Sequence, residues 1–141
     1  MKIKFDNKVG GEDAYSFNSN DIVYIKLNEV SKKDEAELVI GFEKTELIFF
    51  GKYETLLDKY NDINSAFMSF GKQTNVISHH LGNNCISINP EHIRYVGFLD
   101  NGDGCVMIAF DYKNLKVVGP YDELLHLSKR LGLAVSKKDR T

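Results

Sequence analysis

The chain has 141 residues, of which 43% are hydrophobic and 27% charged, with nine Phe and seven Tyr. This length suits one domain, or two very small domains that share a core, and the composition is that of an ordinary globular protein. Residues 1–71 carry nine lysines against thirteen acidic residues, and residues 72–141 nine basic against seven acidic ones. The excess positive charge lies at the end of the chain, so both folded halves are mildly acidic. This argues against a large nucleic-acid-binding face, which is normally basic.

The amino terminus and the apolar stretches indicate where the chain resides. MKIKFDNKVGGEDAY has no apolar run after its lysines, unlike a signal peptide. The longest apolar stretches, LIFF at 47–50 and CVMIAF at 105–110, are shorter than the ~20 residues that cross a bilayer. We therefore expect a cytoplasmic protein without membrane contact, in which Cys85 and Cys105 are reduced and buried.

An internal repeat organises the sequence. Residues 38–58 align without a gap on residues 106–126, with seven identical positions among twenty-one. Average composition would give about one or two identities by chance. Residues 15–25 align on residues 86–96 at an offset three residues larger, as a longer hairpin loop in the first copy would produce. The aligned pairs include Tyr24 with Tyr95, Phe42 with Phe110, and Leu56 with Leu124.

In the first copy, short runs of β-branched and aromatic residues bounded by turn residues predict strands. The expected strands are MKIKF (1–5), the segment around Ser16-Phe17-Asn18, IVYIKL (22–27), ELVIGF (37–42) and ELIFF (46–50), with a charged loop at Asn28–Glu37. A helix is expected between Gly51 and Gly71, because its apolar residues recur at steps of three and four. Those residues are Leu56, Leu57, Tyr60, Ile63, Phe67 and Phe70.

The second copy predicts the same series of elements. A strand at Asn75–His79 precedes Ser87-Ile88-Asn89, IRYVGF (93–98), a tight hairpin turn with Asn101-Gly102, CVMIAF (105–110) and LKVV (115–118). A helix follows Gly119, with Pro120 suited to its first position and Leu124, Leu125 and Leu131 as its core face. This helix is expected to be about two turns shorter than the first one.

Together these elements predict an α+β fold: a tandem duplication of a β-meander followed by a C-terminal helix. The expected organisation is a first β-strand/helix repeat at 1–71, a second at 72–134, and a flexible basic tail at 135–141. The runs at 38–42 and 106–110 are apolar throughout, as in strands covered on both faces. We therefore expect each helix to cover one face and the other copy the opposite face, with approximate pseudo-twofold symmetry. The alternative is that the second face pairs with another chain, as a homodimer.

The second copy resembles the small FlbD-like flagellar proteins. Asn89, Pro90, Ile93 and the helix from Tyr121 carry the likeness, which covers about a third of the chain and implies a strand, turn, hairpin and terminal helix. The segment Asp21–Ile25 is similar to a strand of the DNA-binding domains of LytTR-type response regulators. Both resemblances concern the fold, and fold alone does not assign an activity.

The residue types that carry catalysis or bind metals are not arranged as a site in this sequence. The adjacent His79 and His80 would point to opposite faces of a strand, and no ligand-type residue flanks them at metal-binding spacing. The segment LDNGDGC, with Asp100 and Asp103, lacks the Glu of a calcium loop and is better interpreted as a hairpin. No phosphate-binding glycine motif or nucleophile elbow occurs. The sequence therefore predicts no enzyme activity, no cofactor and no metal.

The remaining hypothesis is a non-enzymatic regulator or inhibitor that acts by protein–protein binding, for example a bacterial or phage accessory protein such as an anti-defence factor. The alternatives are a nucleic-acid-binding regulator and a module that binds a small ligand at the repeat junction. Because the first helix looks longer than its counterpart, its additional turns are the expected partner site. Exposed Met and Phe together mark an adaptable binding surface. The predicted partner-binding residues are Phe67, Met68 and Phe70.

Overall fold

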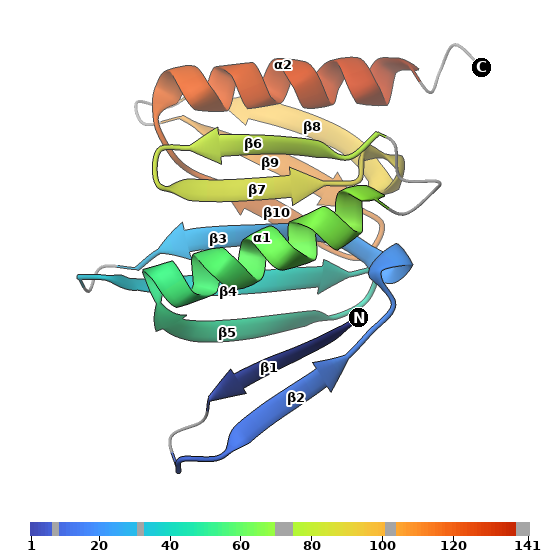
Figure 1. Ribbon diagram of the computed structural model, residues 1–141. Helices are drawn as coiled ribbons and strands as arrows, with labels where there is room; N and C mark the ends of the chain where they lie inside the picture. Colours follow the sequence, from blue (N-terminus) through green and yellow to red (C-terminus); the bar gives the residue numbers. More distant parts are fainter. Residues whose placement is uncertain (7–8, 31–32, 70–74, 101–103, 138–141) are drawn as a thin grey trace.

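The computed structural model describes residues 1–6, 9–30, 33–69, 75–100 and 104–137. Within these residues, ten strands form three antiparallel sheets and two α-helices pack on them, so the predicted α+β class is confirmed (Figure 1). The first half contains β1 (Lys2–Asp6), β2 (Glu12–Ser16), β3 (Ile22–Glu29), β4 (Glu35–Phe42), β5 (Glu46–Lys52) and α1 (Tyr53–Ser69). The second half contains β6 (Ile77–Leu81), β7 (Asn84–Ile88), β8 (Ile93–Leu99), β9 (Cys105–Phe110), β10 (Asn114–Val117) and α2 (Tyr121–Lys137).

The two halves share their element order and several local features. A short 3-10 turn precedes β3 and β8, and each is capped by an asparagine side chain, Asn18 or Asn89, which accepts a hydrogen bond from the backbone N–H two residues on. Both following strands have an irregularity in register directly after their first residue, Ile22 or Ile93. These features recur at the positions that the sequence alignment pairs.

Each helix has 17 residues in the described part of the chain, so the first helix is not two turns longer there, contrary to the expectation. The second helix continues through Ala134 and Val135 because Val135 still packs against the buried cluster beneath it. Residues 135–137, which the sequence placed in a flexible tail, are therefore helical, while 138–141 lie outside the described residues. In the described part of the chain neither helix is long and apolar enough to cross a membrane.

The main sheet combines strands of both halves in the order β5-β4-β3-β7-β6. The hairpin β6–β7, which belongs to the second half in sequence, pairs with β3 of the first half. Tyr24 lies opposite Ile88 and Lys26 opposite Ile86 in this antiparallel pairing. The halves are therefore not two separate sheets in contact, because one half supplies strands to the sheet of the other.

Both faces of this five-stranded sheet are covered, as the apolar run at 38–42 predicted. Leu38 and Ile40 belong to a buried cluster with the apolar face of α1, while Val39 belongs to a second cluster with α2 and the three-stranded sheet β10-β9-β8. Alternate residues of a strand point to opposite faces, which explains how one strand contributes to both clusters. The buried residues of α1 are Leu56, Tyr60, Ile63 and Phe67, and those of α2 are Leu124, Leu127 and Leu131.

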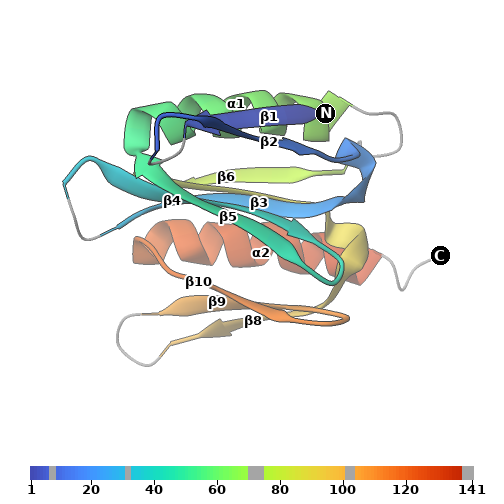
Figure 2. The same ribbon diagram turned by 90° about the horizontal axis from the view of Figure 1, so that it is seen from below.

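The sheets and helices of the molecule are stacked as layers along one axis. The hairpin β1–β2 and α1 lie on one side of the five-stranded sheet, and α2 with the three-stranded sheet lies on the other (Figure 2). Helix α2 packs between β6 of the larger sheet and β8 and β9 of the smaller one. The face of the three-stranded sheet turned away from α2 therefore forms an end of the molecule.

The strand pairing between the halves lacks the reciprocity that the predicted pseudo-twofold packing requires. Strand β7 of the second half pairs with β3 of the first half. A twofold would place β2 of the first half beside β8, but among the described residues β2 pairs with β1 and β8 pairs with β9. The two strands also lie at opposite ends of the molecule in both views (Figures 1 and 2). The contact between the halves is thus heterologous, because the first half contributes a different surface to it than the second half does.

Candidate binding site

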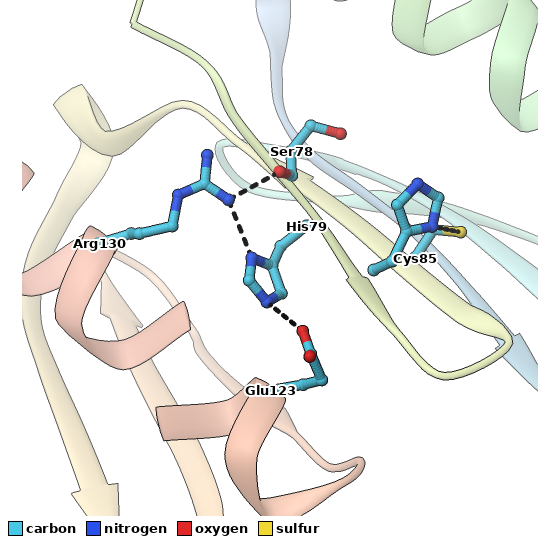
Figure 3. A network of polar contacts seen from close by, with 6 residues as sticks. Ser78, His79, Cys85, Glu123 and Arg130 are labelled. Carbon is cyan, nitrogen blue, oxygen red and sulfur yellow. Dashed lines mark hydrogen bonds and ion pairs between the residues drawn. The ribbon is translucent and has the colours of Figure 1, made fainter. Parts of the chain in front are cut away.

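A polar network joins α2 to the five-stranded sheet at His79 of β6, as Figure 3 shows. The Nε2 atom of His79 lies 3.0 Å from a carboxylate oxygen of Glu123, and its Nδ1 lies 2.8 Å from the Arg130 guanidinium. Arginine can only donate, so Nδ1 accepts and Nε2 carries the proton donated to Glu123. The ring nitrogens of His79 are both used in this network, which ties α2 to the edge of the five-stranded sheet.

The neighbouring His80 points to the other face of the strand, as the sequence predicted for this pair. Its Nδ1 lies 3.3 Å from the sulfur of Cys85, which is opposite His80 in the β6–β7 pairing. Burial raises the pKa of the Cys85 thiol above its ordinary value, which keeps it in the protonated form rather than as the nucleophilic thiolate. This Cys–His contact is therefore a packing contact between neighbouring strands.

A second polar chain lies on the α1 side of the same strands. The Tyr60 hydroxyl is 2.8 Å from the Ser87 hydroxyl, which donates to Ser78 at 2.8 Å. Burial raises the pKa of Tyr60 far above its ordinary value, even though the hydrogen bonds from the two serines oppose the shift. These three hydroxyl groups satisfy one another, which is the arrangement expected of a buried structural network.

The halves also meet around Tyr24, a fully buried residue of β3. Its ring stacks on Phe110 of the second half, and its hydroxyl donates to Glu46 at 2.5 Å. The Lys113 ammonium lies 5.1 Å from the Tyr24 ring centroid and 3.8 Å from Glu46. Burial, and then the Glu46 carboxylate, raises the pKa of Tyr24 far above its ordinary value, while burial lowers that of Lys113 against the opposing effect of Glu46.

Between β3, β7 and β10 the junction leaves a shallow cavity of about 190 Å³, with Lys26 and Lys116 among the residues that line it. Pockets that hold small ligands are usually larger, about 300–1,000 Å³. The cavity therefore gives little support to the small-ligand hypothesis. In the described ranges no three His, Cys, Asp or Glu side chains are grouped so that they could hold a metal ion.

The three residues predicted for partner binding have different positions. Phe67 is completely buried beneath α1 and cannot contribute a contact surface, because its helical position places it on the core face with Ile63. Met68 is 46% exposed, as predicted from its position one residue further around the helix. Phe70 lies outside the described residues. Of the two predicted residues that the structure describes, Met68 is the accessible one.

A larger exposed apolar surface lies on the three-stranded sheet. Val96 and Phe98 of β8 face the core, so Tyr95, Gly97 and Leu99 alternate onto the outer face. Tyr95 is 56% and Leu99 49% exposed, and a Cβ atom added at Gly97 would meet no atom within 4 Å. We call this the outer face; its accessible members are Tyr95, Gly97, Leu99 and the half-buried Met107, while Cys105 and Ala109 on the same side of β9 are buried.

Sequence reasoning missed the outer face, although a signal for it was present. The segment 105–110 is apolar throughout, which is typical of a strand covered on both faces. In the equivalent strand β4 both faces are covered, but β9 is covered on the α2 side while Met107 is partly exposed on the other. The outer face therefore has the composition of a covered surface, but no helix or sheet among the described residues lies over it.

Strand β8 is also an edge strand, since the sheet order β10-β9-β8 ends with it. The equivalent strand of the first half, β3, has both edges paired, to β4 and β7. An edge strand offers its backbone groups to a further strand, and apolar residues beside such an edge strengthen that association. The outer face and the β8 edge together form the candidate binding site.

Comparison with protein-family models, with curated proteins and with solved structures finds no match to this chain. The resemblances of the second half to the FlbD-like proteins and of the first half to the LytTR-type domains therefore stay predictions. The function proposed below depends on the geometry of the chain itself.

Proposed function

We propose that this protein acts by binding a strand of a protein partner at the β8 edge and the outer face, and not by catalysis. The observation that carries the proposal is the contrast between β3 and β8. Both strands occupy the same place in their half, but β3 is paired on both edges and β8 on one. Strand addition uses main-chain hydrogen bonds for affinity and alternate side chains for specificity.

The proposal treats the two halves as copies of one unit. The shared element order, the asparagine caps and the common register irregularity support that view. Tyr95 and Leu99 would supply the apolar anchors, since exposed aromatic and aliphatic side chains on one face are typical of interaction surfaces. A regulator or inhibitor that docks on another protein, as the sequence predicted, would use such a surface.

A photo-crosslinking residue placed at position 97 tests this proposal. Gly97 has room for a side chain, so the substitution should leave the fold intact. We expect the residue at 97 to form adducts with a protein, and the same residue at exposed His126 on α2 to form none. Adding Tyr95→Asp should abolish the adducts while the thermal midpoint stays unchanged, because Tyr95 lies outside the core.

The control variant is Met68→Glu, which places a charge on an accessible residue of the site predicted on α1. Loss of partner binding with Met68→Glu, and not with Tyr95→Asp, would move the site to α1 and contradict the proposal. Binding to nucleic acid that is unaffected by Tyr95→Asp would favour the nucleic-acid alternative instead.

A further inference from the structure

The strand that fits the β8 edge is present in the chain itself. We infer that β2 of a second copy of this protein adds to β8, so that molecules associate head to tail. This inference depends on the proposed binding site and names its partner. The template for it is the pairing of β7 with β3 inside one molecule.

In that template, a hairpin of one half extends the sheet of the other. One strand of the hairpin, β7, pairs with β3, while the other strand, β6, lies at the edge of the sheet and packs against α2 of its own half. Leu81 at the end of β6 lies against Gly119, and it shares a buried cluster with Val117 of β10. The hairpin is thus held by its own half and presents one strand edge to the other half.

The hairpin β1–β2 is held by its own half in the same manner. Phe5 near the end of β1 stacks on Phe49 of β5 with ring centroids 3.8 Å apart, and Ile3 is buried in the cluster formed by α1. Strand β2 pairs with β1 along one edge, and all five of its residues are exposed. It occupies the place that β7 has in the second half, but no strand of its own chain lies beyond it in the described sheet.

One molecule cannot join these two edges by itself. The hairpin β1–β2 and the strand β8 lie at opposite ends of the layered structure in both views (Figures 1 and 2). A second molecule can supply the missing strand, because a heterologous contact between two different surfaces repeats from copy to copy. The contact inside the chain, β7 on β3, would then continue between chains as β2 on β8.

The template also fixes the register. Tyr24 lies opposite Ile88, Ile25 opposite Ser87, and Lys26 opposite Ile86. Moving both partners by the repeat offset of 71 residues places Tyr95 opposite Phe17, Val96 opposite Ser16, and Gly97 opposite Tyr15 of the second copy.

The side chains suit this register. Tyr15 and Phe17 lie on the side of the outer face in this register, and each ring packs edge-on against an aromatic ring of its own molecule, Phe49 or Phe42. The Tyr15 ring is 37% exposed, and this exposed part would cover Gly97, whose Cβ position is open. Ala14 and Ser16 are small and would face the α2 side of the sheet. The pairing would therefore bring aromatic groups to the apolar outer face and leave small groups toward the helix.

Crosslinking between two single-cysteine variants tests the inference. Gly97→Cys is mixed with an affinity-tagged Tyr15→Cys and treated with a short bis-maleimide, so that mixed dimers are resolved by size. Cys85 and Cys105 are both buried, so the introduced thiols are the accessible ones. We expect mixed dimers severalfold in excess of those from Gly97→Cys with Lys129→Cys, an exposed position on α2 at the other end of the second molecule.

A second pair, Tyr95→Cys with Phe17→Cys, shares the predicted register and should also crosslink. The thermal midpoint of each variant verifies that it is folded. If both folded pairs crosslink no more than the Lys129→Cys control, the inference is overturned. If the photo-crosslinking residue at position 97 then still captures a different protein, the proposed function stands and the second copy is not the partner. If it captures no protein, the proposed function and the inference about the second copy both fail.

Discussion

The ring of Tyr24 lies directly over the backbone of Gly41. A Cβ atom at position 41 would be 2.1 Å from the Tyr24 ring, and Tyr24 itself is fully buried between β4 and Phe110 of the second half. The equivalent pair in the second half is Tyr95 opposite Ala109, where a methyl group is accommodated because Tyr95 is turned to solvent. The difference between Gly41 and Ala109 thus follows the difference between a covered and an uncovered sheet face.

The close approach predicts that Gly41→Ala is destabilising. Overpacking a tight core costs about 1–3 kcal/mol, and the Tyr24 ring cannot move without disturbing Phe110 and Glu46. Gly97→Ala is the matched control, since its Cβ would meet no neighbour. Urea unfolding measures both. Equal stability of Gly41→Ala and the wild type would mean that the Tyr24 ring is not held over the strand.

The two helices should contribute equally to the core. Leu56 and Leu124 occupy aligned positions and are both almost completely buried. Leu56→Ala and Leu124→Ala should each reduce the free energy of unfolding by about 2–5 kcal/mol, because each leaves a cavity beneath its helix. Losses below about 1 kcal/mol for both variants would show that the helix faces are assigned wrongly.

Alkaline pH should destabilise the protein through Tyr60. Burial raises the pKa of Tyr60 in the folded state, so the folded state keeps a proton that the unfolded chain loses above about pH 10. Its contribution is fully present below pH 10 and is lost as the pH rises toward the folded pKa. Tyr60→Phe removes the ionisable group but leaves the Ser87–Ser78 hydrogen bond.

The free energy of unfolding of the wild type should therefore fall more steeply above pH 10 than that of Tyr60→Phe, by about 1 kcal/mol at pH 11. Denaturant unfolding at a series of pH values measures the difference. Parallel curves for the two proteins above pH 10 would contradict the buried, protonated state of Tyr60.

The His79 network predicts a defined tautomer. Because Arg130 donates to Nδ1, neutral His79 should carry its proton on Nε2, which donates to Glu123. Nitrogen-15 NMR of the imidazole ring distinguishes the two tautomers directly. In Arg130→Met the preference should weaken while the fold is kept, since Arg130 is exposed. A protonated Nδ1 in the wild type at neutral pH would contradict the network.

The sequence predicted much of the local structure because local signals specify it. Strand runs and the buried residues of α1 follow from short-range patterns. Gly51 and Gly119 correctly indicated where the helices start, since α1 and α2 begin two residues later. The apolar run at 38–42 also predicted that β4 is covered on both faces, as the two clusters confirm.

The arrangement of the halves could not be obtained in this way. Whether β6–β7 pairs with its own half or with β3 depends on contacts between residues distant in sequence, for which no local pattern exists. Phe67 is buried on the core face of α1, whereas the sequence placed it in an exposed turn on the basis of a difference in helix length that the described residues do not show. The exposure of Tyr95 beside the apolar strand β9 depends on tertiary structure, because it follows only from the order of the strands in the sheet.

The most direct test of the β8 binding site is amide hydrogen exchange measured residue by residue in dilute and in concentrated protein. Strand addition would protect backbone groups at both edges, because each edge gains hydrogen-bond partners. Phe17 already donates its N–H to Met1 of its own chain, so the outward-facing amides of β2 are those of Ala14 and Ser16. We predict that these two amides and those of Val96 and Phe98 exchange more slowly at high concentration, while the amides of β4 stay unchanged. Exchange in β8 and β2 that is independent of concentration, in a sample whose sedimentation shows association, would contradict the account.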